Sequence, residues 1–163
     1  MTRSEHGKPI RIIGLGNLLR GDDAVGLLAA RRLRERVGDR IEVVEAEMAG
    51  VEILELMAGA RVVMLVDAAR SGQVPGTIHR LDPSATPISP TLFPHSSHAL
   101  NASDALELGR TLGSLPPTVI VYGIEVGDTS AGRPLSTQVA RALDEVVEQI
   151  LRESGKLTCM NSI

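Results

Sequence analysis

Two adjacent carboxylates, Asp22 and Asp23, are the side chains of this chain best placed to do chemistry. They follow a loop that begins Gly14-Leu15-Gly16-Asn17, directly after the apolar run 10–13. A glycine loop between a strand and a helix usually holds a phosphate, because the helix N-terminus presents free N–H groups and partial positive charge. Two carboxylates would repel a phosphate, but they suit a helix cap or a metal ion. We expect one of these two acids to be an N-cap or first-turn residue of the following helix.

Two further candidate ligands follow other segments of the chain. Asp67 ends the apolar run Val62–Val66, and His98 closes the proline-rich loop 83–97 and opens the next helix. Sites in parallel sheets gather outside the carboxyl ends of the strands, so we expect Asp23, Asp67 and His98 to meet there. Two carboxylates and an imidazole suit a divalent ion of intermediate softness, such as nickel or zinc. Each residue also has a structural interpretation: Asp67 as a hydrogen-bonded loop cap, and His98 as a surface residue.

Other catalytic arrangements have less support in the sequence. The serine-hydrolase pattern G-x-S-x-G and the zinc-protease pattern H-E-x-x-H are both absent. The serines at 96–97, beside His98, are therefore poor nucleophile candidates, and Cys159 has no histidine near it in sequence. The segment Asp128-Thr129-Ser130 resembles half of an aspartic-protease site, but it occurs once and lacks the glycine, which favours a turn. His79, within an expected strand, is interpreted as structural or solvated.

A dinucleotide-binding fingerprint is only partly present. Gly14-x-Gly16 follows a strand, and Glu45 ends the second strand, as in a Rossmann unit. However, the third glycine of the fingerprint would fall at Leu19, and the acid pair occupies the place of the pyrophosphate. A dinucleotide-binding domain is therefore a weaker hypothesis.

Alternating apolar runs and amphipathic stretches position these residues. The expected strands are 10–15, 41–46, 62–66, 77–81 and 118–124, and the expected helices lie between residues 24 and 37, at 51–57, at 99–112 and around 139–150. Fully apolar strands that alternate with helices indicate a largely parallel sheet covered on both faces. Between Asp67 and Thr77 there is no room for a crossover helix, so the strand 77–81 should run antiparallel. The sequence predicts an α/β fold, a three-layer α/β/α sandwich with a mixed five-stranded sheet, mostly parallel with one antiparallel strand.

Composition and charge limit the classes of function. The 163 residues are 43% hydrophobic, which fits one domain with a core at about 10–152 and tails at 1–9 and 155–163. A net charge of −3 and only two aromatic residues, Phe93 and Tyr122, argue against a nucleic-acid partner. There is no long apolar segment and only one cysteine. We expect a cytoplasmic protein with no membrane partner, acting as a monomer.

Four segments carry a resemblance to a known family. They are Gly14-x-Gly16-Asn17-x-Leu19-x-x-Asp22-Asp23-x-x-Gly26, Val66-Asp67-Ala68-Ala69 with Pro75-Gly76-Thr77, Ser97-His98-x-Leu100 with Asp104, and Gly123-Ile124-Glu125 with Leu135-Ser136. With these motifs in this order and spacing, the chain resembles the nickel–iron hydrogenase maturation endopeptidases from about residue 10 to residue 152.

The resemblance implies a hydrolase that removes the C-terminal extension from a hydrogenase large-subunit precursor after nickel insertion. It implies catalytic and metal-contacting roles for Asp23, Asp67 and His98, with Asp23 standing where other members often carry glutamate. It also implies an aspartyl-type, enzyme-activating protease with no permanently bound cofactor. Nickel would be presented by the substrate, the nickel-loaded precursor, and other divalent ions could substitute for it.

One segment departs from the family pattern. The family usually shows Gly-Thr-x-Gly after the second strand, whereas this chain has Glu47-Met48-Ala49-Gly50. The departure concerns how the substrate tail is bound and which precursor is recognised. The alternative to the enzyme is a non-catalytic metal- or nucleotide-binding module at the same sheet edge, for example a chaperone for the large subunit.

Overall fold

The computed structural model describes residues 9–47, 49–83, 85–89, 91–93 and 101–160. The strands in this part of the chain are β1 (Ile10–Gly16), β2 (Ile41–Glu47), β3 (Val62–Ala69), β4 (Ile78–Leu81) and β5 (Thr118–Glu125). The helices are α1 (Val25–Arg34), α2 (Glu52–Met57), α3 (Ala102–Leu112) and α4 (Thr137–Met160), with a short 3-10 helix, η1 (Gly21–Ala24), before α1. No helix in the described ranges is long and apolar enough to cross a bilayer.

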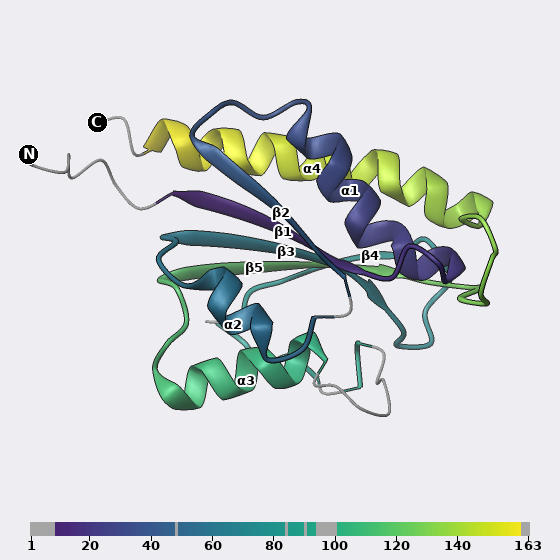
Figure 1. Ribbon diagram of the computed structural model, residues 1–163, viewed down its shortest axis with the longest axis horizontal. Helices are drawn as coiled ribbons and strands as arrows, with labels where there is room; N and C mark the ends of the chain where they lie inside the picture. Colours follow the sequence, from purple (N-terminus) through teal and green to yellow (C-terminus); the bar gives the residue numbers. More distant parts are fainter. Residues whose placement is uncertain (1–8, 48, 84, 90, 94–100, 161–163) are drawn as a thin grey trace, which may run out of the picture.

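The strands form one sheet in the order β2-β1-β3-β5-β4. The pairs β1–β2, β1–β3 and β3–β5 are parallel, and β4 is antiparallel to β5. The connection from β3 to β4 is too short for a crossover helix, which is why β4 reverses direction. The predicted mixed sheet with one antiparallel strand is confirmed (Figure 1).

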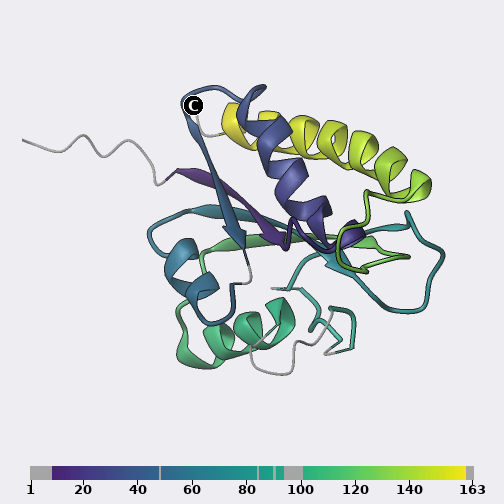
Figure 2. The same cartoon turned by 45° about the vertical axis from the view of Figure 1, so that its right-hand side comes forward.

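Helices cover both faces of the sheet. The helices α1 and α4 lie together on one face, and α2 and α3 lie on the other (Figures 1 and 2). Alternate residues of β3 enter the two cores: Met64 packs with the α1–α4 side, and Val63 and Leu65 pack with the α2–α3 side. Because both faces are buried, β3 is apolar from Val62 to Val66, and the polar Asp67 is an exception within the strand.

The helix α1 lies unusually close to β1 because glycines face each other. A Cβ atom on Gly26 would stand 2.2 Å from the carbonyl oxygen of Leu15, and one on Gly14 would stand 2.3 Å from the carbonyl oxygen of Gly26. Any larger side chain at either position would push helix and strand apart. This close approach fixes where the loop between β1 and α1 leaves the sheet.

Several element boundaries differ from the sequence-based expectation. The strand β3 continues through Asp67 to Ala69, because Ala68 and Ala69 still pair with β5. The helix α3 begins at Ala102, where Asn101 caps it in a capping box with Asp104. The expected frayed tail from residue 155 is wrong up to Met160. There α4 continues as a helix, because Leu157 packs against the core beyond the buried Ser154.

Candidate active site

The acidic residues gather where β1 leaves the sheet. The pairing of β1 with β3 ends at Gly14 and Val66, whereas the pairing of β3 with β5 continues to Ala69 and Glu125. The chain leaves β1 toward β2 on one side, and β3 lies on the other, so this is the point where the strand order reverses. In open α/β sheets, ligands bind in the crevice at such a point, outside the carboxyl ends of the strands.

Asp23 and Asp67 are the two candidate ligands that the structure brings together. Asp23 lies in η1, directly after the β1 loop, and Asp67 lies on β3 opposite Gly123 of β5. Both are partly buried, and the charge of Asp23 acts on Asp67. The Asp67 carboxylate accepts a hydrogen bond of 2.8 Å from the backbone N–H of Ala68.

Burial raises the pKa of both carboxyl groups. The pKa of Asp23 is raised to about 6 by burial, an effect that the positive charges of Arg20 and Arg70 partly offset. The pKa of Asp67 is raised to about 8 by burial and then by the negative charge of Asp23, against the opposing hydrogen bond from Ala68. Near neutral pH the pair therefore retains a proton, and a bound cation would release it by stabilising both carboxylates.

The glycine loop fixes the backbone of Asp23. The carbonyl oxygen of Asp23 accepts a hydrogen bond from the Asn17 N–H (3.1 Å), and the Asp23 N–H donates to the carbonyl oxygen of Arg20 (3.0 Å). Gly16 has a φ of 148°, and a Cβ atom there would stand 2.1 Å from the Asp23 carbonyl oxygen. The Asn17 side chain accepts from the Leu19 N–H (2.9 Å) and holds the loop in a turn. The Gly-Asn pair thus presents Asp23 at the sheet edge.

Asp22 has a different role from the expected helix cap. Neither η1 nor α1 has a side-chain cap, so the expected N-cap is wrong, although both acids lie in the first turn of η1 as expected. Asp22 is fully buried instead, because its carboxylate reaches the loop between β5 and α4. It accepts hydrogen bonds from the N–H groups of Gly127 (2.9 Å), Asp128 (3.1 Å) and Ser136 (2.6 Å) and from the Ser136 hydroxyl (2.8 Å).

The third predicted ligand, His98, lies outside the described residues, and its role stays a prediction. Among the residues that the structure does describe, no group of three His, Cys, Asp or Glu side chains could hold a metal ion. The expected turn at Asp128-Thr129-Ser130 is present, since the Ser130 N–H donates to the Asp128 carboxylate (2.9 Å).

Glu125 is a buried carboxylate to which the sequence pattern gave no role of its own. It is 1% exposed at the end of β5. It accepts hydrogen bonds from the Ser71 N–H (2.9 Å) and hydroxyl, and it contacts the Nε2 atom of His79 at 3.0 Å. Glu125 therefore fixes the start of the β3–β4 loop, and His79 has the structural role expected of it. The one sequence signal was an acidic residue that ends an otherwise apolar strand.

The segment after β2 that differs from the family pattern also contacts the glycine loop. The Glu47 carboxylate accepts a hydrogen bond of 3.4 Å from the Leu18 N–H. Glu47 is exposed and lies at the same edge of the sheet as the acid pair. Met48, beside it, lies outside the described residues.

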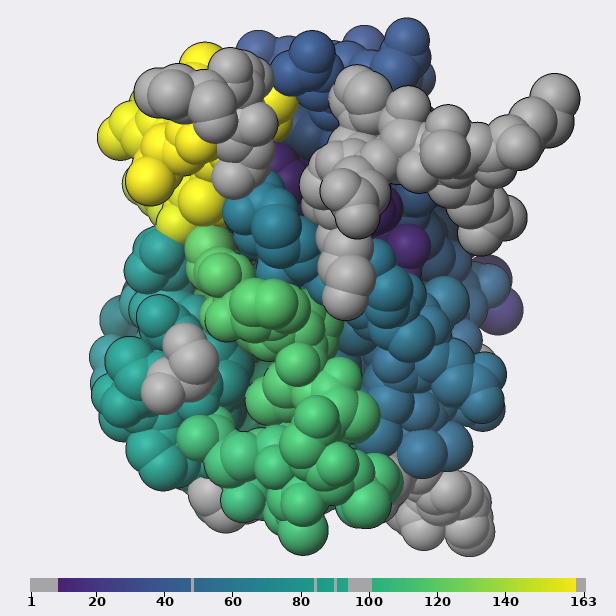
Figure 3. Space-filling model, turned by 90° about the vertical axis from the view of Figure 1, so that its left-hand side faces the viewer, coloured from purple at the N-terminus to yellow at the C-terminus, as the bar shows by residue number. Residues whose placement is uncertain are grey.

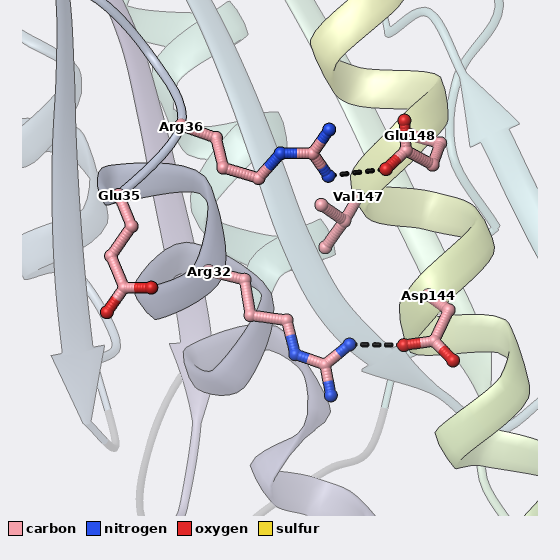
Figure 4. Close-up of a pocket in the computed structure, with 6 residues that line it drawn as sticks. All are labelled: Arg32, Glu35, Arg36, Asp144, Val147 and Glu148. Atoms are coloured by element: carbon pink, nitrogen blue, oxygen red, sulfur yellow. Dashed lines mark hydrogen bonds and ion pairs between the residues drawn. The ribbon is translucent and has the colours of Figure 1, made fainter.

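A pocket between α1 and α4 is separate from the acid pair. It is lined by Arg32, Glu35, Arg36, Asp144, Val147 and Glu148 (Figure 4). The ion pairs Arg32–Asp144 and Arg36–Glu148 join the two helices there. These residues lie toward the end of α1, whereas the acid pair lies at its start. Figure 3 shows the side where the parallel strands begin, with the last turns of α4 in yellow, away from the acid pair.

Comparisons with known proteins agree with this fold and show the family. The family model described as hydrogenase maturation protease matches residues 26–153. The hydrogenase 2 maturation protease of Escherichia coli is 30% identical over 154 residues, which cover 90% of this chain and 92% of that protein. A putative hydrogenase maturation protease of Methanocaldococcus jannaschii is 32% identical over 157 residues, covering 91% and 98%.

A solved structure of a hydrogenase maturating endopeptidase has the same fold as this chain. The hydrogenase maturating endopeptidase HybD from E. coli superposes with a TM-score of 0.75 at 28% identity, covering 90% of this chain and 94% of that one. The fold is a mixed α/β/α sandwich with two acids at the switch point of its sheet. The chain belongs to the hydrogenase maturation protease family and is a peptidase. This membership favours the enzyme over the non-catalytic module and the dinucleotide-binding domain.

Proposed function

We propose that this protein removes the C-terminal extension from the large-subunit precursor of a nickel–iron hydrogenase once nickel has been inserted. The observation that carries the proposal is the pair of partly buried carboxylates, Asp23 and Asp67, at the switch point of the sheet. Two acids with raised pKa values have no structural need to lie together. They are suited to a cation that arrives with the substrate.

The nickel ion reaches the site bound to the cysteines of the precursor, and the protease supplies its open ligands. Asp23, Asp67 and, in this proposal, His98 complete the coordination of the ion. Binding places the scissile peptide bond beside the acid pair. Water is then activated either by the ion or by one of the carboxylates as a general base, and it attacks the scissile carbonyl carbon.

The same ligands explain how a loaded precursor is distinguished from an empty one. Without an ion, the negative charge of Asp23 raises the pKa of Asp67, and an empty precursor offers no cation to stabilise both carboxylates. With an ion, both carboxylates form new bonds. Specificity is then the difference between these two binding free energies, and the enzyme needs no permanently bound metal. Another divalent ion of similar coordination chemistry could substitute for nickel.

Single substitutions test the proposal. Asp23→Asn, Asp67→Asn and His98→Ala should each slow the trimming of a co-expressed precursor at least about 100-fold, since each removes a ligand or a base. The mass of the large subunit, measured before and after processing, gives the readout. Asp39→Asn, an exposed acid after α1, is the matched control and should trim normally. Near-normal trimming by all three site variants would overturn the proposal. A large subunit that is bound but never shortened by the wild type would favour the chaperone instead.

The setting of the reaction is part of the proposal. The proposed compartment is the cytoplasm. The proposed state is a monomer, since the acid pair and its supporting loops come from one chain. Light scattering during size-exclusion chromatography should give the mass of a single 17.3 kDa chain. A stable dimer whose partner contributes to the site would contradict this arrangement.

A further inference from the structure

Two arginines, Arg20 and Arg70, flank the acid pair. Arg20 lies in the same loop as Asp23, and Arg70 follows the last residue of β3. Both side chains are exposed, whereas their backbones are held in place. The Arg20 carbonyl oxygen accepts a hydrogen bond from the Asp23 N–H (3.0 Å), and the Arg70 N–H donates to the carbonyl oxygen of the buried Leu92 (2.7 Å).

Both guanidinium groups converge on one residue of a third loop. The Nε atom of Arg20 donates to the carbonyl oxygen of Thr129 (3.4 Å), and the Nη2 atom of Arg70 donates to the Thr129 hydroxyl (2.9 Å). The buried Asp22 carboxylate fixes this loop through the neighbouring residues 127–128. Three loops from different strands thus hold two positive charges together beside the acid pair.

The charges of these two arginines act on Asp23, but neither arginine forms a direct ion pair within the described residues. Several other arginines of the described chain pair with carboxylates, as Arg32 does with Asp144 (Figure 4) and Arg80 with Glu153. Within the ranges that the structure describes, neither Arg20 nor Arg70 has a carboxylate oxygen within 4.0 Å of a guanidinium nitrogen. Thr129 is neutral and uses only part of their donor capacity. Each guanidinium carries five N–H donors, so most remain for a ligand.

We propose that Arg20 and Arg70 form a subsite that binds a carboxylate of the precursor peptide next to the scissile bond. The proposal rests on the function proposed above. Guanidinium groups bind carboxylates through paired, charge-assisted hydrogen bonds, and two of them fixed on one residue define where the carboxylate lies.

The carboxylate could come from two sources of the same chemistry. One is an acidic side chain of the precursor near the cut. The other is produced by the reaction itself: hydrolysis breaks the C–N bond, the hydroxyl of water joins the carbonyl carbon, and a proton goes to the leaving amine. This step leaves an α-carboxylate at the new C-terminus of the large subunit, beside the acid pair.

Trimming kinetics give the first test. Arg20→Gln and Arg70→Gln should each weaken precursor binding about tenfold, and the double variant more, because each removes charge-assisted hydrogen bonds. If an acidic side chain is the ligand, KM rises in the glutamine variants, and kcat changes only through the pKa of Asp23, which the two arginines lower. Replacing the acidic side chains of the precursor by amides then abolishes the effect. If the α-carboxylate is the ligand, inhibition by the trimmed product weakens instead.

Controls separate the subsite from a merely structural role. Arg141→Gln, at an exposed position of α4, should leave KM and product inhibition unchanged. Arg20→Lys and Arg70→Lys should restore part of the binding, since lysine keeps the charge but not the paired geometry. The wild-type KM should rise with salt more steeply than that of the double variant. Unchanged KM, product inhibition and salt dependence in the glutamine variants would overturn the subsite while leaving the proposed function in place.

A binding measurement tests the subsite without any cleavage. The Nε–H signals of Arg20 and Arg70 are followed by NMR while acetyl-tetraglutamate amide or acetyl-tetraalanine free acid is added. The uncharged controls are acetyl-tetraglutamine amide and acetyl-tetraalanine amide. Shifts with a charged peptide only, weakened at the remaining arginine in each single glutamine variant, support the subsite even if the wild type trims no precursor. The charged peptide that acts identifies the source, and no shift with either one overturns the subsite.

Discussion

Replacing Asp67 by asparagine should make the protein more stable at neutral pH while removing its activity. Asp67 lies inside β3, where every other residue is buried. Among the described residues, only the Ala68 N–H donates a hydrogen bond to its carboxylate, and the negative charge of Asp23 acts on it. Asparagine keeps the shape and the acceptor oxygen but never carries the charge. Function and stability therefore oppose each other at this position.

The size of the effect follows from the raised pKa of Asp67. Burial and Asp23 raise this pKa from 3.8 to about 8, and each pKa unit is about 1.4 kcal/mol. A group whose pKa is higher in the folded state stabilises the fold fully below pH 3.8, and this contribution is lost as the pH rises toward 8. The loss at pH 7.5 has an upper limit of about 5 kcal/mol. Local rearrangement and water reduce this, so we expect Asp67→Asn to stabilise the protein by about 1–3 kcal/mol.

Thermal and urea unfolding with a chelator present measure this difference. At pH 7.5 the melting temperature of Asp67→Asn should exceed that of the wild type by about 3–9 °C. At pH 4.5 the difference in unfolding free energy should fall below about 1 kcal/mol, because this pH lies only about 0.7 unit above the unfolded pKa of 3.8 and most of the loss has not yet occurred. Asp39→Asn, at an exposed position, should differ little from the wild type at either pH. A variant that is less stable at pH 7.5, or a difference independent of pH, would refute the reasoning.

Two further substitutions test how the loops and the first helix are fixed. Asp22→Asn replaces a buried carboxylate on which four donors converge, from residues 127–128 and from the N–H and hydroxyl of Ser136, and should lower the free energy of unfolding by about 2–4 kcal/mol in urea. Ser136→Ala removes one of the four bonds and should lower it by about 1 kcal/mol; equal losses would contradict the anchoring role of Asp22. Gly26→Ala would place a Cβ atom 2.2 Å from a carbonyl oxygen of β1 and should lower the melting temperature by at least about 5 °C. Gly155→Ala, in α4 with no atom within 4 Å of the new Cβ, should raise the melting temperature instead, and a change of the same sign in both would contradict the close approach of α1 and β1.

The arrangement of the sheet could be predicted from the sequence because its determinants are local. The apolar runs that become β1, β3 and β5 leave a continuous pattern along the chain. The direction of β4 followed from the length of the connection before it, which excludes a crossover. The expectation that Asp23 and Asp67 share one edge needed only the rule that sites lie outside the carboxyl ends of parallel strands.

The supporting contacts of the site could not be predicted, because they join loops that are far apart in sequence. Asp22 binds Ser136 across 114 positions, and Arg20 reaches Thr129 across 109. Such contacts leave no periodic pattern in either segment. Adjacent acids look alike in sequence, so nothing local showed that Asp22 is an internal anchor and Asp23 is the accessible acid. The buried Glu125 was missed for the same reason, since Ser71 and His79 lie in other elements.

X-ray absorption at the nickel edge tests the central claim most directly. A nickel-loaded precursor is mixed with the protease and frozen before it is cut, and its spectrum is compared with that of the precursor alone. Coordination by Asp23, Asp67 and His98 predicts new oxygen and nitrogen scatterers at about 2.0–2.2 Å from the metal, the range found for such ligands on a related ion. Asp67→Asn should remove one oxygen from this shell. A nickel spectrum that does not change on mixing, followed by normal trimming, would contradict the account.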